Sequence, residues 1–76
     1  MTDLGLYLAK RTVNKAEVSR RTGISKSRLT QLTSNESAKL RADELYLIAL
    51  AINVDPGEMF KELFRRLGLR ENKDGV

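Results

Sequence analysis

The stretch from Asn14 to Leu32, NKAEVSRRTGISKSRLTQL, contains two helix starts with one glycine between them. Asn14 and Ser25 are favourable N-cap residues, because a side-chain oxygen there accepts hydrogen bonds from the unpaired N–H groups of the first helical turn. Glu17 completes the spacing of a reciprocal capping box with Asn14. Gly23 tolerates the left-handed conformation in which many helices end. The stretch therefore predicts two short helices, 14–22 and about 25–33, joined by a tight turn.

The composition of these two helices fits a steep crossing. Ser19 is small, and a small side chain allows the helix backbones to approach each other. Leu29 and Leu32 form an apolar stripe on the second helix, and its remaining side chains point outward. These are the features of a helix-turn-helix, in which the second helix presents its outer face to DNA.

Three further helices are predicted around this unit, over 3–11, 41–53 and 55–67. The helix over 41–53 is apolar nearly all round, with Leu47 and Leu50 widening its stripe, so we expect it to lie centrally in the core. The last helix begins at the N-cap Asp55 and is expected to end at Gly68. In the connection 33–39, Asn35 can take a left-handed turn. We expect an all-α, compact five-helix bundle formed by residues 1–68, followed by a charged tail over 69–76.

The composition excludes several classes of protein. The chain of 76 residues has no cysteine and no histidine, so disulfides, thiolate metal sites and the commonest general base are absent. We therefore expect no enzymatic activity, no metal and no cofactor. No apolar run approaches a membrane span, and no signal peptide precedes the first helix. A cytoplasmic protein that does not engage membranes is the expectation.

Positive charge is concentrated in the first half of the sequence. The net charge is +4, but the segment from Lys10 to Arg28 contains seven basic residues and a single acidic one, Glu17. A concentrated positive field favours a polyanion as partner, nucleic acid before a membrane surface. The plain alternative is a solvated basic face.

The stretch resembles the phage-repressor and Cro-like (XRE-type) helix-turn-helix family. The matching residues are Asn14, Ala16, Glu17, Val18, Ser19, Gly23, Ile24, Ser25, Leu29 and Leu32. The likeness continues through LRADELYLIALAINVDPGEMF, residues 40–60. It implies a lambda-repressor-like fold and a transcriptional regulator that binds a pseudo-palindromic operator as a dimer, with helix 25–33 in the major groove. Lys15 departs from the family, which often has Gln at that position.

The resemblance and the side-chain chemistry together suggest two groups of DNA contacts. The expected base-reading residues are Lys26, Ser27, Arg28, Thr30 and Gln31. Lys and Arg favour guanine, and Gln favours adenine. The expected phosphate-binding residues are Asn14, Lys15, Ser25, Ser34, Asn35, Lys39 and Arg41. At least one of Arg20 and Arg21 is expected to be only solvated or an ion-pair partner.

The last predicted helix carries more apolar surface than one contact requires. Met59 and Leu63 form one stripe, while Phe60, Phe64 and Leu67 form a neighbouring one. Because small monomers rarely expose a large apolar patch, the second stripe predicts a homodimer interface. We expect no second, ligand-sensing domain within these 76 residues and therefore no small-molecule ligand, although the sequence fits a stand-alone regulator and the DNA-binding piece of a longer repressor equally well.

One alternative from another functional class remains. The same helical fold serves as a protein-interaction module, such as an antitoxin-type toxin-binding domain, whose basic segment would meet an acidic protein surface. A salt titration with and without DNA distinguishes this module from a regulator that binds double-stranded DNA.

Overall fold

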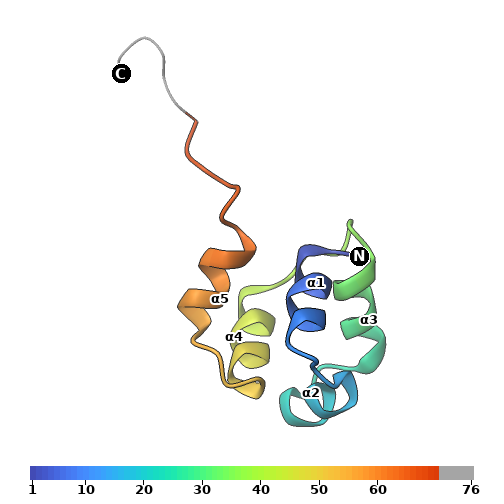
Figure 1. Cartoon of the computed structure of the whole chain (residues 1–76). Helices are drawn as coiled ribbons and strands as arrows, with labels where there is room; N and C mark the ends of the chain where they lie inside the picture. Colours follow the sequence, from blue (N-terminus) through green and yellow to red (C-terminus); the bar gives the residue numbers. More distant parts are fainter. Residues whose placement is uncertain (71–76) are drawn as a thin grey trace.

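The computed structural model describes residues 1–70 and contains five helices and no strand in that part of the chain (Figure 1). The helices are α1 (Asp3–Lys10), α2 (Lys15–Thr22), α3 (Lys26–Ser34), α4 (Ala42–Ala51) and α5 (Pro56–Leu63). The predicted all-α helix-turn-helix fold is therefore confirmed. Helix α3 runs to Ser34, slightly beyond the predicted range, and its last turn contains Thr33, whose hydroxyl donates to the Leu29 carbonyl.

The predicted caps at Asn14, Ser25 and Asp55 are confirmed. The Asn14 Oδ1 accepts from Ala16 N at 2.9 Å, and the Ser25 Oγ accepts from Arg28 N at 3.1 Å. The reciprocal half of the expected capping box is wrong, because the Glu17 carboxylate pairs with Arg20 instead.

Backbone conformation at the turns agrees with one prediction and corrects another. Gly23 adopts φ +79°, and its N–H donates to the Ser19 carbonyl, so the left-handed end of α2 is confirmed. Asn35 is extended at φ −103°, so the left-handed turn expected there is wrong. The left-handed non-glycine residues within 1–70 are Thr12 and Asn53, which follow α1 and α4.

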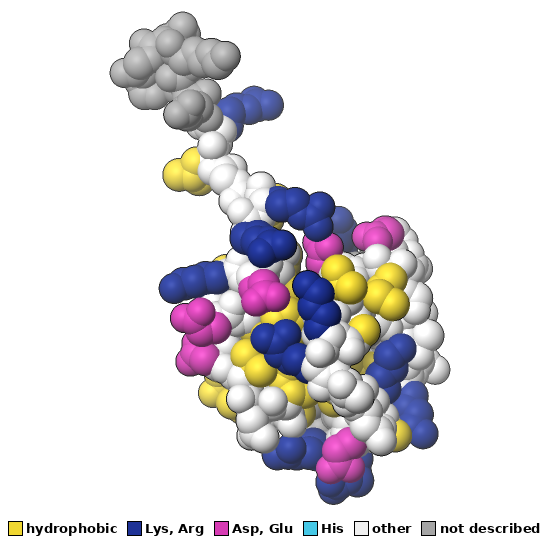
Figure 2. All heavy atoms as spheres, in the orientation of Figure 1, with side chains coloured by type: hydrophobic (Ala, Val, Ile, Leu, Met, Phe, Trp, Pro, Cys, Tyr) yellow, Lys and Arg dark blue, Asp and Glu magenta, His cyan; other side chains and the backbone are white. Residues whose placement is uncertain are grey.

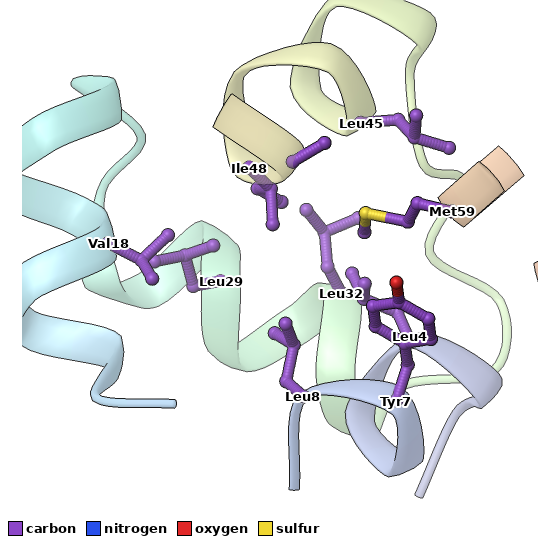
Figure 3. Packing of buried hydrophobic residues seen from close by; sticks show 10 residues of the cluster. Leu4, Tyr7, Leu8, Val18, Leu29, Leu32, Leu45, Ile48 and Met59 are labelled. Carbon is purple, nitrogen blue, oxygen red and sulfur yellow. The ribbon is translucent and has the colours of Figure 1, made fainter. Parts of the chain in front are cut away.

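The core lies where α1, α3, α4 and α5 meet, with α2 packed at one end (Figure 3). Leu29, Ile48 and Met59 are its largest fully buried side chains. Leu47 and Leu50, by contrast, are 38% and 47% exposed. The expectation that they widen the buried stripe of α4 is wrong, because the bundle covers only one face of that helix and no other helix within residues 1–70 packs on its opposite side.

Helices α1 and α3 approach each other closely at Gly5. A Cβ atom built on Gly5 would lie 2.3 Å from the Thr33 carbonyl oxygen, far inside van der Waals contact. Thr2 fixes the same contact: its N–H donates to the Thr33 carbonyl at 3.0 Å, and its hydroxyl donates to the Leu32 carbonyl at 2.6 Å. The end of α3 is thus anchored to the start of α1.

Helix α5 ends at Leu63, one turn before the predicted end at Gly68. Phe64 is the C-cap residue at φ −113°, and the Leu67 N–H donates back to the Phe64 carbonyl in a turn. The reason is that little apolar packing is available beyond α5: residues 65–70 are all exposed, and the ion pair of Arg66 with Asp3 lies on the surface. Most of the predicted tail, 71–76, lies outside the described residues.

The Gly23→Ala variant is expected to lower the free energy of unfolding by about 1–2 kcal/mol, because an L residue is disfavoured in the left-handed region. The space around Gly23 is open, so the backbone conformation alone causes the loss. Thermal melting checks the value, with Gly23→Asn as the milder control, because Asn visits this region more readily. Equal stability of all three proteins would contradict the assignment.

Candidate nucleic-acid interface

The outer face of α3 carries a stripe of polar side chains opposite its buried leucines. Leu29 and Leu32 are almost fully buried, and they hold the inner face against the core. The stripe consists of the exposed residues Lys26, Ser27, Thr30 and Gln31. Within residues 1–70 none of these four side chains makes a hydrogen bond or an ion pair with another residue. Their donors and acceptors are therefore available to a ligand on that face.

Arg28 lies on the flank of α3 and is held by other parts of the protein. Its Nε and Nη2 donate to the two carboxylate oxygens of Glu44 on α4, at 2.8 and 3.0 Å. Nη2 also donates to the Lys39 carbonyl at 2.7 Å. This fork places the guanidinium between α3, α4 and their connection, away from the four free side chains of the stripe.

The ion pair changes the titration of Glu44, which is only 7% exposed. Hydrogen bonds from Arg28 are the main cause that lowers the pKa of the Glu44 carboxyl below its ordinary value, against desolvation, which raises it. The Arg41 N–H contributes a further hydrogen bond at 2.9 Å. At neutral pH Glu44 is therefore charged in the folded protein, and its ion pair with Arg28 joins α4 to α3.

Asn14, Lys15 and Ser25 lie at the starts of α2 and α3. The side-chain oxygens of Asn14 and Ser25 are used as caps, while the Asn14 amide and the Ser25 hydroxyl hydrogen remain as donors. Lys15 is exposed and has no ion-pair partner within residues 1–70. The start of α2 therefore carries the free positive charge of Lys15, and the starts of α2 and α3 each carry a free side-chain donor.

The remaining predicted phosphate-binding residues lie at or after the end of α3. Some of their side chains already have partners in the described chain, and others do not. Ser34 and Lys39 have exposed side chains without a hydrogen-bond partner in the described chain. The Asn35 Oδ1 accepts from both the N–H and the hydroxyl of Ser37, which shapes the loop. Arg41 pairs with Asp43 at 3.2 Å on the surface.

Arg20 and Arg21 both have partners in the protein. Arg20 pairs with Glu17, and the Arg21 Nη1 donates to the Ala51 carbonyl at 2.8 Å. We expected at least one of them to be only solvated or an ion-pair partner, and Arg20 is an ion-pair partner. The contact of Arg21 with the end of α4 was not predicted, because no spacing rule relates residues 30 positions apart.

The fold and this surface define a helix-turn-helix DNA-binding domain. A family model described as the Cro/C1-type HTH DNA-binding domain matches residues 4–62, and the chain belongs to that family. Its ligand class is DNA. No curated protein and no solved structure was found to match the chain. Among the described residues, no helix is long and apolar enough to cross a membrane.

The Glu44→Gln variant is expected to melt at a lower temperature than the wild type at pH 7. Because the folded-state pKa of Glu44 is lowered, its contribution is fully present above the ordinary value of 4.5 and is lost as pH falls through the folded value. The difference between the two melting temperatures should therefore shrink in acid. Thermal melts from pH 7 to pH 3 measure it, with the exposed Asp43→Asn as control. A constant difference would show that the carboxylate charge contributes nothing.

Proposed function

We propose that this protein is a sequence-specific transcriptional regulator that binds a pseudo-palindromic DNA operator as a homodimer. One observation carries the proposal: the four polar side chains on the outer face of α3 have no partner within the described chain. Unpaired donors and acceptors on a rigid helix that fits the major groove are what direct reading of base edges requires.

Each residue of the stripe has a base-reading role that follows from its chemistry. Lys26 donates to guanine O6 and N7, and Gln31 forms a pair of hydrogen bonds with adenine N6 and N7. Ser27 and Thr30 accept from or donate to neighbouring base edges. For Arg28, which Glu44 holds, we propose a positioning role for α3 in place of base reading.

Phosphate contacts orient the domain on the duplex. Lys15 supplies a free positive charge at the start of α2, and Asn14 and Ser25 retain donors beside the N–H groups of the helix starts. Such groups bind phosphate oxygens without reading sequence. The proposed contacts at or after the end of α3 are Ser34, Asn35, Lys39 and Arg41.

Dimerisation supplies the specificity that one recognition helix lacks. A single helix makes few base contacts, each worth roughly 1–3 kcal/mol of discrimination. Two-fold pairing doubles the contacts and places the two recognition helices about 34 Å apart, one turn of DNA. The proposed interface residues are Phe60, Phe64 and Leu67. Phe60 is 56% exposed and its ring lies 5.1 Å from that of Phe64, so an apolar aromatic surface is available.

Selection of bound DNA from a random pool tests the proposal directly. We expect a consensus of two inverted half-sites with centres about one helical turn apart. No enrichment of any motif at about 100 mM salt, where a few phosphate contacts alone bind weakly, would overturn it.

Gln31→Ala is expected to weaken binding to the selected operator by roughly 1–3 kcal/mol and to relax preference at one base pair in each half-site. Binding to random DNA should barely change.

Lys15→Ala is the contrasting variant. It should weaken binding to operator and to random DNA alike, and it should reduce the slope of log K against log salt by about one unit. Fluorescence anisotropy over a salt series measures both effects. An equal loss of Gln31→Ala on operator and random DNA would contradict base reading.

A protein-interaction module is the second candidate, favoured by the exposed apolar side chains Tyr46, Leu47 and Leu50 on α4. Binding that requires a protein partner and persists without DNA would select this function.

A further inference from the structure

Arg28 and Glu44 form an ion pair that differs from the others within residues 1–70. Their side chains are 30% and 9% exposed, whereas both partners of each of the other three pairs are more than half exposed. Figure 2 shows that charged side chains are spread over the protein surface seen in that view. Ion pairs in such exposed places are weak, because water and salt screen them. The Arg28–Glu44 pair is better shielded and holds its two side chains in one arrangement.

The hydrogen bonds of Arg28 occupy both forks of its guanidinium group. One fork consists of the Nε and Nη2 donors, and the other of the Nη1 and Nη2 donors. The first faces Glu44, with Nε and Nη2 donating to its two oxygens at 2.8 and 3.0 Å. Nη2 also donates to the Lys39 carbonyl at 2.7 Å, so both of its hydrogens are used. Bidentate reading of guanine takes two parallel donors, for O6 and N7. While these contacts last, Arg28 has no free fork for it.

The Glu44 carboxylate is held in place independently of Arg28. Its Oε1 accepts from the Arg41 N–H at 2.9 Å. Arg41 directly precedes α4 and Glu44 is the third residue of that helix, so the start of the helix itself fixes this bond. The carboxylate is therefore already in position to receive the guanidinium when α3 and α4 fold into the bundle.

The geometry points to Glu44 as a specificity-determining residue, which withholds Arg28 from the bases and leaves reading to the four side chains of the stripe. The inference rests on the DNA-binding regulator of the proposed function and concerns its sequence preference alone. Arg28 lies three positions before Gln31, and residues three apart are neighbours on a helix surface. A guanidinium released by Glu44 would therefore reach a base pair beside those that Gln31 reads.

Selection of bound DNA from a random pool, run in parallel on the wild type and on Glu44→Gln, tests the inference. Glutamine keeps one oxygen for the Arg41 N–H, but its amide N–H₂ group then opposes the guanidinium donors, so Arg28 is released. We expect the variant to select one additional guanine in each half-site and to bind it about fivefold or more tightly than another base there. The wild type should bind all four bases at that position alike. A purely structural defect lowers affinity but adds no base preference.

Two controls assign the gained guanine to Arg28. Asp43→Asn removes the same charge from the neighbouring residue of α4, breaks only the exposed pair with Arg41 and should add no guanine. The double variant Glu44→Gln/Arg28→Gln should lose the guanine that Glu44→Gln gains. An unchanged consensus for Glu44→Gln, or the same added guanine for Asp43→Asn or for the double variant, overturns the inference.

Arg28→Gln alone tests the same point without altering Glu44. Because Arg28 reads no base in the wild type, this variant should select the wild-type consensus, whatever its affinity. Loss of a guanine from each half-site would overturn the inference, even if Glu44→Gln failed to fold, and would leave the regulator standing. A wild type that selects no DNA sequence would contradict the proposed function itself.

Discussion

Gly5→Ala is expected to be strongly destabilising, with a loss of about 1–3 kcal/mol in the free energy of unfolding. The added methyl group would lie 2.3 Å from the Thr33 carbonyl oxygen, and a backbone oxygen cannot move without displacing α3. Alanine stabilises an isolated helix relative to glycine by up to about 1 kcal/mol. The sign of the change in the free energy of unfolding therefore shows whether the clash or the helix propensity dominates. A separation of α1 from α3 also weakens the two hydrogen bonds that Thr2 makes to the end of the recognition helix.

Thermal and chemical denaturation measure this loss, which corresponds to a fall in melting temperature of roughly 5–20 °C for a domain of this size. Gly68→Ala is the control, because nothing lies within 4 Å of its Cβ position. DNA binding of the variant at low temperature should also weaken, since Thr33 belongs to the recognition helix. A Gly5→Ala protein as stable as the wild type would show that α1 and α3 are less closely packed than described.

Phe60→Glu is expected to abolish dimerisation and to lower operator affinity by two orders of magnitude or more, about 3 kcal/mol. The reason is that a charge in a desolvated apolar contact costs several kcal/mol unless it dissociates the contact. Phe60 suits this test better than Phe64, because Phe64 is half-buried and packs against the core. The helical circular-dichroism signal should survive in the Phe60 variant.

Tyr46→Glu is the matched control, since Tyr46 is 54% exposed and Phe60 56%. Sedimentation should show monomers only for Phe60→Glu. A dimeric Phe60→Glu would remove this residue from the interface. Dissociation by both variants would mean that the contact extends over α4 and is wider than proposed.

Local signals in the sequence account for most of the helix boundaries. The caps at Asn14 and Ser25 bond to N–H groups within three residues, so the interaction that begins each helix is contained in the same short stretch. The left-handed Gly23 is equally local. Asn35 shows the limit of such signals, because its side chain bonds to Ser37 and stabilises an extended conformation instead.

The candidate site divides in the same way. That Lys26, Ser27 and Gln31 share the outer face of α3 follows from helical periodicity, once Leu29 and Leu32 are placed inside. Their contacts with DNA remain predictions. The ion pair of Arg28 could not be predicted, because its partner Glu44 is 16 positions away and comes within reach only in the folded bundle.

The sequence by itself determined the helices, the turn at Gly23 and the polar face of α3, since each depends on groups a few residues apart. Only the tertiary structure decided which surfaces are covered: that Gly5 is a contact point, that Leu47 and Leu50 stay exposed, and that α5 stops at Leu63. The physical reason is that burial depends on which elements meet. In a bundle of five short helices, one face of α4 is left exposed in the described chain, and residues 65–70 are exposed apart from the ion pair of Arg66 with Asp3.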